Sequence, residues 1–256
     1  MIRLSVPGAS LDIHPEQGAW ISSLVLDGTE LLYVHAPPPP DDLPGGIPIL
    51  YPICGRPLAD SPLPRHGYAW RLPWTPEPPP APDTVLLSLS SPDGALLTLR
   101  ASLAPRHFSL ALAIKGQTPF SLHPHPGFHP YFLDIGSISV PPPCPRWQYA
   151  PDYVHLLPGP LPPPPMPLPA SSPLQRDLLL QASTALLHRR DGKTLHLAAT
   201  PGTLPFLQFY ADFRHPFLAV EPWSAPAGAT APDAPFRPAP LAPGATRTYG
   251  FTLDLA

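Results

Sequence analysis

Proline occupies 48 of the 256 positions in this sequence, and no other feature restricts its fold as strongly. Proline fixes φ and has no amide proton, so it breaks helices and is tolerated in sheets mainly at edges, strand ends and bulges. Together with 17 glycines, it brings the composition close to that of low-complexity chains. However, 43% of the residues are hydrophobic and 13% are charged, the reverse of a disordered composition. We therefore expect short strands joined by many rigid loops.

Strand-like alternation of apolar and polar residues recurs along the chain, and no segment keeps a 3.6-residue period. The clearest runs cover 84–90, 95–101 and 107–114, with an Asp-Gly turn between the first two. Further expected strands are 2–6, 11–13, 20–26, 31–34, 185–187, 194–198, 204–211, 217–220 and 246–255. The sequence predicts an all-β fold, a sandwich of antiparallel sheets forming a single domain over residues 1–256. Proline-rich segments occupy 141–173, where we expect a stiff surface arm, and 225–243.

Charge and segment composition exclude several classes of function. A net charge of -3 and a pI near 6.4 leave no basic patch for nucleic acid. No apolar run approaches the ~18 residues that would cross a membrane, and the N-terminus carries no secretion signal. The two cysteines, Cys54 and Cys144, form no CxxC motif, which fits a reducing compartment. We therefore expect a cytoplasmic protein without membrane or nucleic-acid partners.

Two stretches concentrate side chains suited to acid and base catalysis. Residues 122–132 hold three histidines, three aromatic residues and three prolines, which neither a plain core strand nor a plain loop requires. Residues 217–223 place one carboxylate, Glu221, at the end of an apolar run. A carboxylate beside a buried strand tends to have a raised pKa, which suits a base near neutral pH. The working hypothesis is a histidine acid that faces a glutamate base.

Two further segments hold candidate binding residues. In residues 45–56 glycines and prolines recur too often for a helix or a central strand, so we expect an irregular, closely packed segment that ends at Arg56. His66 lies in a loop between an arginine and a glycine, where its ring can project into a cleft. On the residues alone, Arg56 can equally be a surface arginine and His66 an ordinary loop histidine.

Five motifs, taken in order and with their rough spacing, resemble the aldose 1-epimerase (galactose mutarotase-like) family, which includes the hexose-6-phosphate 1-epimerases. The motifs are 45–48 leading to Gly55-Arg56, His66-Gly67-Tyr68, 127–132, Asp177-Leu178-Leu179 and 220–223, and the resemblance covers roughly residues 10–255. It implies the large twisted antiparallel β-sandwich of that family, with a sugar bound on one concave face. It also implies an isomerase that needs no metal or organic cofactor, with a small-molecule sugar as its partner, acting as a monomer or homodimer.

The resemblance also assigns roles to individual residues. Glu221 matches the general base and His129 the general acid, which together open the cyclic hemiacetal so that it can close on its other face. Arg56, His66 and Asp177 match residues that hold the ring oxygen and the hydroxyls. The branch that recognises phosphate often has an arginine where this chain has Trp70, so we expect a free or unusual aldose.

Other interpretations stay open at this point. His123, His125 and His129 resemble the ligands of a metal-dependent β-barrel enzyme, because a His-x-His pair on a strand points both rings to one face. A non-catalytic carbohydrate-binding or sensing protein on the same fold is another alternative, since fold does not determine function. The rings of Tyr131 and Trp223, like that of Phe209, can form an apolar wall for a sugar or belong to the core.

Overall fold

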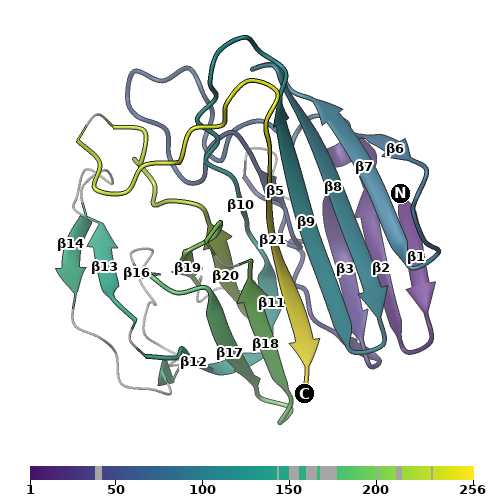
Figure 1. Ribbon diagram of the computed structural model, residues 1–256. Helices are drawn as coiled ribbons and strands as arrows, with labels where there is room; N and C mark the ends of the chain where they lie inside the picture. Colours follow the sequence, from purple (N-terminus) through teal and green to yellow (C-terminus); the bar gives the residue numbers. More distant parts are fainter. Residues whose placement is uncertain are drawn as a thin grey trace.

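The fold is almost entirely β, as Figure 1 shows. It was obtained as a computed structural model, which describes residues 1–37, 42–142, 144–149, 156–159, 166–167, 178–200, 202–211, 215–231 and 233–256. The strands form three sheets, and neighbouring strands within each sheet are antiparallel. The predicted all-β class and antiparallel sandwich are therefore confirmed.

The smallest sheet has the strand order β1-β2-β3-β4. Its strands are β1 (Ile2–Val6), β2 (Ala9–His14), β3 (Trp20–Leu26) and β4 (Thr29–Glu30), with the 3-10 helix η1 (Pro15–Gln17) between β2 and β3.

The eight-stranded sheet has the order β14-β13-β16-β19-β20-β10-β5, and β11 also pairs with β20. Its strands are β5 (Ile49–Leu50), β10 (Gly127–Phe128), β11 (Tyr131–Leu133), β13 (Arg146–Tyr149), β14 (Leu156–Gly159), β16 (Leu178–Leu180), β19 (Phe206–Tyr210) and β20 (Phe217–Trp223).

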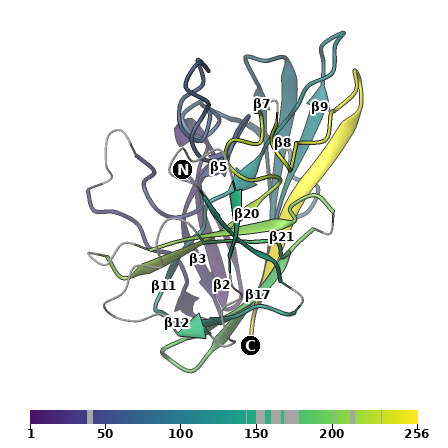
Figure 2. The same cartoon turned by 90° about the vertical axis from the view of Figure 1, so that its left-hand side faces the viewer.

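The nine-stranded sheet has the order β15-β12-β17-β18-β21-β9-β8-β7-β6. Its strands are β6 (Thr75–Glu77), β7 (Thr84–Ser90), β8 (Ala95–Ala104), β9 (His107–Gly116), β12 (Ile135–Ser139), β15 (Met166–Pro167), β17 (Thr184–Arg189), β18 (Thr194–Ala199) and β21 (Thr246–Leu255). Figure 2 shows the N-terminal strands β2 and β3 lying beside the layer formed by β8, β9 and β21.

Most strands expected from alternation are present, and one is replaced by a different structure. The strands over 2–6, 20–26, 84–90 and 246–255 have the predicted bounds. The strand expected at 31–34 is wrong, since the chain there forms single bridges at Leu32 and Val34. The physical reason is that the segment changes its hydrogen-bond partner from residue to residue. The amide of Leu31 donates to Leu24 of β3, that of Tyr33 donates to Tyr131 of β11, and that of His35 donates to Pro44. The segment therefore forms no continuous ladder with one strand, and the Leu32 amide donates to the Glu30 carboxylate instead.

Proline does not prevent strands in the segment 141–173, where only an arm was expected. β13 and β14 pair with each other, β13 continues onto β16, and β15 pairs with β12. Pro158 and Pro167 lie on β14 and β15, the end strands of their sheets. Proline is tolerated there because an end strand leaves half of its amides unpaired.

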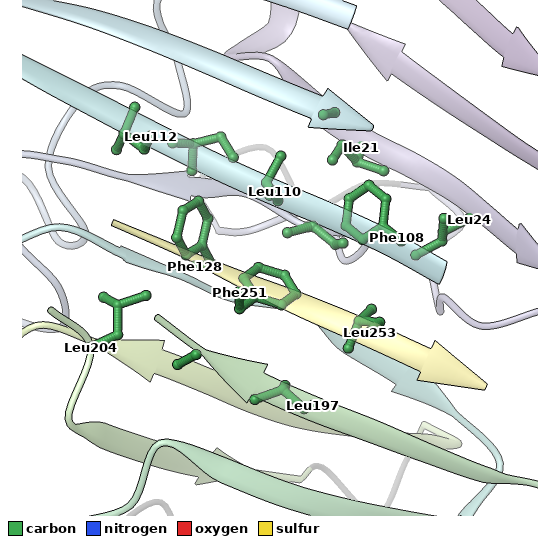
Figure 3. Close-up of a cluster of buried hydrophobic side chains, with 14 of the residues drawn as sticks. Ile21, Leu24, Phe108, Leu110, Leu112, Phe128, Leu197, Leu204, Phe251 and Leu253 are labelled. Carbon is green, nitrogen blue, oxygen red and sulfur yellow. The ribbon is translucent and has the colours of Figure 1, made fainter. Parts of the chain in front are cut away.

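Aromatic side chains join the two large sheets. The Phe128 ring on β10 lies 5.2 Å from the Phe251 ring on β21, and Phe108 on β9 lies 6.2 Å from Phe251 (Figure 3). These three rings are buried in one hydrophobic cluster that also takes in Ile21 and Leu24 of β3. The cluster anchors β10, and with it the residues that follow β10 in the sequence.

The helical content of the described residues is limited to short segments, and none is long and apolar enough to cross a membrane.

Candidate active site

A pocket of about 140 Å³ lies against β19 and β20 of the eight-stranded sheet, beneath the loop that contains residues 55–66. It is lined by Asp42, Gly55, Arg56, Arg65, His66, His129, Gln208, Tyr210, Glu221, Trp223 and Ala227. The structure therefore brings together four of the five residues predicted from the sequence. The fifth, Asp177, lies outside the described residues.

Strand register places the predicted acid opposite the predicted base. Gly127 of β10 pairs with Trp223 of β20, and Tyr131 of β11 pairs with Ala219 of the same strand. Both pairs keep one antiparallel register. His129 lies midway between Gly127 and Tyr131, and Glu221 lies midway along the facing segment of β20, so the two residues face each other. Pro130, which cannot donate to a ladder, separates β10 from β11 at this point.

The alternation of side chains along residues 128–132 explains the unusual composition of this stretch. Successive residues of an extended chain point to opposite faces. Phe128 and Phe132 are fully buried in the main core, whereas His129 and Tyr131 lie on the opposite face, where their rings stack at 4.5 Å with an interplanar angle of 15°. The stretch thus anchors the sheet with one face and furnishes the site with the other.

His129 and Glu221 are in direct contact. Nε2 of His129 lies 3.1 Å from Oε2 of Glu221, and both residues are only 2% exposed. Glu221 itself pairs across the ladder with Gln208 of β19, which is also buried and also lines the pocket. Glu221 is therefore held on a central strand between two paired neighbours, and His129 is held by the register of β10 and β11.

Burial shifts the two groups in opposite directions. Loss of water lowers the pKa of His129 well below its usual value, and the nearby His66 ring and the charge of Arg65 act in the same direction. Loss of water raises the pKa of Glu221 well above its usual value, and the charge of Arg65 and the Trp223 side chain offset part of this. His129 is thus a stronger acid, and Glu221 a stronger base, than the same groups in water.

His66 presents a buried donor to the pocket. The backbone amide of Gly55 donates a 3.0 Å hydrogen bond to Nδ1 of His66, and the His66 amide donates back to the Gly55 carbonyl at 2.8 Å. Burial lowers the pKa of His66 well below its usual value, so the ring is neutral and carries its proton on Nε2. Nε2 has no hydrogen-bond partner among the described residues, so an oxygen of a bound ligand can satisfy it.

The backbone around His66 is held in an unusual conformation. His66 has φ of 63° and Gly67 has φ of 70°, and a Cβ at Gly67 would lie 2.1 Å from the Tyr51 carbonyl oxygen. A non-glycine residue with positive φ costs energy and persists where the surroundings impose it, commonly at functional sites. This conformation directs the ring of His66 inward while the preceding Arg65 stays at the mouth of the pocket.

The rim of the pocket is charged and half exposed. Arg56, which is exposed, and Arg65 contribute guanidinium groups, and Asp42 contributes a carboxylate. The side chains of Arg65 and Asp42 contact each other at 3.4 Å. The pocket therefore combines a buried acid–base floor with a rim that can bind oxygens.

Several lining residues were not identified from the sequence. Gln208 could have been found, because it is the single polar residue in the buried run Phe206–Phe209. Asp42, Arg65 and Tyr210 carried no distinguishing pattern. They reach the site through the path of loops and through the pairing of β19 with β20, neither of which is evident in the sequence.

The three aromatic residues considered as a sugar wall have different positions. Trp223 lines the pocket. Tyr131 is buried behind the site, stacked on His129. Phe209 is fully buried in the main core. One of the three is therefore placed to contact a ligand.

The structure does not gather the histidines of the metal alternative. His123 is exposed, His125 is buried and donates from Nε2 to the Ala225 carbonyl at 2.6 Å, and His129 contacts Glu221. Among the described residues, no cluster of three or more histidine, cysteine or acidic side chains could hold a metal ion.

Comparison of the chain with known proteins gives matches at the level of structure. No family model matches, and no curated protein matches in sequence. Among solved structures, the Slr1438 protein from Synechocystis sp. PCC 6803 superposes with a TM-score of 0.80 at 20% identity, covering 100% of this chain and 95% of that one. A galactose mutarotase-like protein from Lactobacillus casei ATCC 334 has a TM-score of 0.79 at 20% identity, with 100% of both chains covered.

A galactose 1-epimerase from Lactobacillus acidophilus NCFM is also similar, with a TM-score of 0.69 at 15% identity over 98% of this chain and 92% of that one. These similarities extend over essentially the whole of each chain. The protein therefore has the galactose mutarotase-like fold.

Proposed function

We propose that this protein is an aldose 1-epimerase, an isomerase that interconverts the α and β anomers of a sugar. The observation that carries the proposal is the buried contact of 3.1 Å between His129 and Glu221, on the floor of a pocket lined by oxygen-binding groups. The galactose mutarotase-like fold supports it at the level of architecture.

The pair suits the proton transfers of ring opening. Glu221 removes the proton from the anomeric hydroxyl while His129 gives its proton to the ring oxygen, and the bond from C1 to the ring oxygen breaks to leave an aldehyde. After rotation about C1–C2, the former ring oxygen attacks the other face of the aldehyde. This oxygen then returns its proton to His129, and Glu221 returns its proton to the anomeric oxygen. No atom or electron is gained or lost over the cycle.

The opposite effects of burial favour the difficult step. The reactive form of the pair, imidazolium and carboxylate, differs from a neutral imidazole beside a carboxylic acid only in the position of one proton. Burial penalises the charged form and favours the neutral one, which is the sense of both pKa shifts. The charged form is therefore the minor one in the free site, and ring opening, which converts it into the neutral form, is favoured by burial. A positioned acid or base typically contributes ~10²- to 10⁴-fold to the rate.

The other lining groups fit the binding of a sugar. The Nε2 proton of His66 and the guanidinium of Arg56 can donate to ring or hydroxyl oxygens, and the latter can donate to two at once. Both sugar oxygens that change protonation are bonded to the same carbon. A neighbouring acid and base can therefore reach one oxygen each.

Anomer exchange measured by NMR saturation transfer tests the proposal. The folded protein is added to glucose, galactose and further aldoses, and exchange between the anomeric protons is compared with that in buffer. We expect acceleration for at least one aldose. No acceleration for any of them would overturn the proposal, and sugar binding without acceleration would instead support the non-catalytic carbohydrate-binding alternative.

A further inference from the structure

Two charged residues at the mouth of the pocket exchange no proton with the sugar in the proposed reaction. We propose that Asp42 and Arg65 form a specificity pair that binds two neighbouring hydroxyls of an unphosphorylated aldose and disfavours sugar phosphates. This inference rests on the proposed function, because it concerns the ligand of the same pocket.

The ion pair between these two residues is too weak to contribute much to the stability of the fold. Nη1 of Arg65 lies 3.4 Å from Oδ1 of Asp42, whereas charge-assisted hydrogen bonds are typically about 2.7–2.9 Å long. The two side chains are 49% and 58% exposed. Exposed ion pairs of this kind contribute little to folding. Their position on the rim of the pocket therefore indicates a role in binding.

The Asp42 carboxylate and the backbone beside Arg65 are nevertheless held in place. Oδ1 of Asp42 accepts a 2.8 Å hydrogen bond from the amide of Leu43, which is buried. Arg65 is followed by His66, whose own amide bonds to Gly55 and whose ring is fixed by the same residue. The carboxylate and the guanidinium thus start from anchored positions and extend into the mouth.

The chemistry of the pair matches that of a diol. A hydroxyl both donates and accepts, an ionised carboxylate only accepts, and a guanidinium only donates. One hydroxyl of the sugar can therefore donate to Asp42 while its neighbour accepts from Arg65. The long contact between the two side chains leaves each with hydrogen-bonding capacity for this purpose.

The same arrangement disfavours a phosphate ester. A phosphoryl group has strong acceptor oxygens and close to two negative charges near neutral pH. The guanidinium groups of Arg56 and Arg65 could bind it, but Asp42, which contacts Arg65, would then lie next to a like charge. A carboxylate also has no proton to donate to a phosphate oxygen. Selection against a ligand commonly relies on such a repulsive group.

Substitution of the carboxylate, with a matched control, tests the pair. Asp42→Asn removes the charge at the rim, and Asp60→Asn makes the same change at an exposed position outside the pocket. For each protein, anomer exchange gives kcat/KM for free aldoses and for their 6-phosphates. Binding of a methyl glycoside and of an aldose 6-phosphate to the Glu221→Gln protein, with and without Asp42→Asn, is followed by tryptophan fluorescence, since Trp223 lines the pocket.

We expect the wild type to prefer the free aldose by at least about tenfold in kcat/KM. Asp42→Asn should lower kcat/KM and methyl glycoside affinity about tenfold, as expected for loss of a charge-assisted hydrogen bond, and should narrow the preference over the 6-phosphate. Arg65→Gln should weaken methyl glycoside binding by a similar factor, with Arg100→Gln, at an exposed position on β8, as its control.

The outcomes separate this inference from the proposed function. If anomers exchange but the wild type prefers 6-phosphates, or Asp42→Asn behaves like Asp60→Asn, the specificity pair is wrong and the epimerase stands. If no anomer exchanges but the methyl glycoside binds and Asp42→Asn weakens that binding, the pair stands and the epimerase is wrong. Absence of any sugar binding would overturn the specificity pair.

Discussion

At the scale of single residues, the site depends on burial acting in opposite directions on two side chains in contact. Both roles were predicted from residue type and from resemblance, and the structure adds the contact of 3.1 Å and its buried surroundings. The surroundings could not be predicted, because they come from Trp223, Gln208 and loop residues far apart in the sequence. The orientation of the His66 ring likewise depends on its hydrogen bond from the Gly55 amide, which no local sequence motif indicates.

Replacing His129, the proposed acid, should abolish most of the proposed activity. We expect His129→Asn to lower the anomer-exchange rate by about 10²-fold or more, because the ring oxygen then leaves without a proton donor. His123→Asn, which removes an exposed histidine six residues earlier in the chain, should leave the rate unchanged. A loss smaller than about threefold in His129→Asn would count against its role as the acid.

The buried carboxylate should also make stability depend on pH. An unfolded glutamate ionises near pH ~4.3, whereas the folded pKa of Glu221 is raised, so between these values unfolding releases a proton and the free energy of unfolding falls as pH increases. Glutamine does not titrate, so the free energy of unfolding of Glu221→Gln does not fall with pH for this reason. Relative to wild type, the variant should therefore gain on the order of 1–2 kcal/mol in free energy of unfolding between pH 4.5 and pH 8.

Denaturant unfolding at the two pH values measures this gain. His129→Asn provides the opposite sign, because the lowered pKa of His129 makes the wild type lose stability as pH falls below the unfolded value near ~6.5. The free energy of unfolding of His129→Asn should therefore increase relative to that of the wild type as pH falls. A Glu221→Gln protein whose stability difference from wild type is the same at both pH values would show that Glu221 is not held with a raised pKa.

At the scale of elements, the site depends on β10 and β11 pairing with β20 in one shared register. Alternation in the sequence predicted many strands, since a strand with one buried face shows it in its pattern. It failed at 31–34 because that segment changes its hydrogen-bond partner from residue to residue and forms no continuous ladder with one strand. It could not indicate that β10 and β11 would align with β20, because pairing between distant strands is set by the assembled sheet.

The close packing around β10 predicts that a methyl group at Gly127 will disturb the site. A Cβ there would lie 2.5 Å from Sγ of Cys54 and 2.8 Å from Cδ1 of Trp223. Gly127→Ala should therefore destabilise the fold by about 1–3 kcal/mol and shift β10 relative to β20. Thermal unfolding and the anomer-exchange rate report these two effects.

Gly136→Ala is the matched control. Gly136 is also a strand glycine without positive φ, and its added Cβ would lie 3.3 Å from Cγ of Arg190, a side chain that can move. We expect this variant to keep wild-type activity. Equal behaviour of the two alanine variants would show that the tight packing of β10 does not position the site.

At the scale of the whole molecule, one hydrophobic core joins the two large sheets through aromatic rings. The pocket lies on the opposite face of the eight-stranded sheet. The all-β class was predictable because proline and alternating runs leave few other folds for a chain that is still rich in apolar residues. The division into three sheets was not, since it depends on which strands pair across long stretches of sequence. The site residues come together only through that assembly.

Removing the ring that bridges the sheets should therefore be costly. Phe128→Ala leaves a cavity against Phe251 and should lower the free energy of unfolding by about 3–5 kcal/mol. Phe120→Ala removes the same ring at a position that is 61% exposed and should have little effect. Denaturant unfolding of the two variants makes the comparison, and equal stabilities would contradict the bridging role of Phe128.

The central claim is that the buried pair of Glu221 and His129 exchanges the anomers of an aldose. NMR saturation transfer on the best aldose, with Glu221→Gln compared with wild type and with the exposed Glu16→Gln, tests it most directly. We predict rapid exchange in wild type and in Glu16→Gln, and no acceleration over buffer by a folded Glu221→Gln protein. A folded Glu221→Gln protein that exchanges anomers at the wild-type rate would contradict the claim.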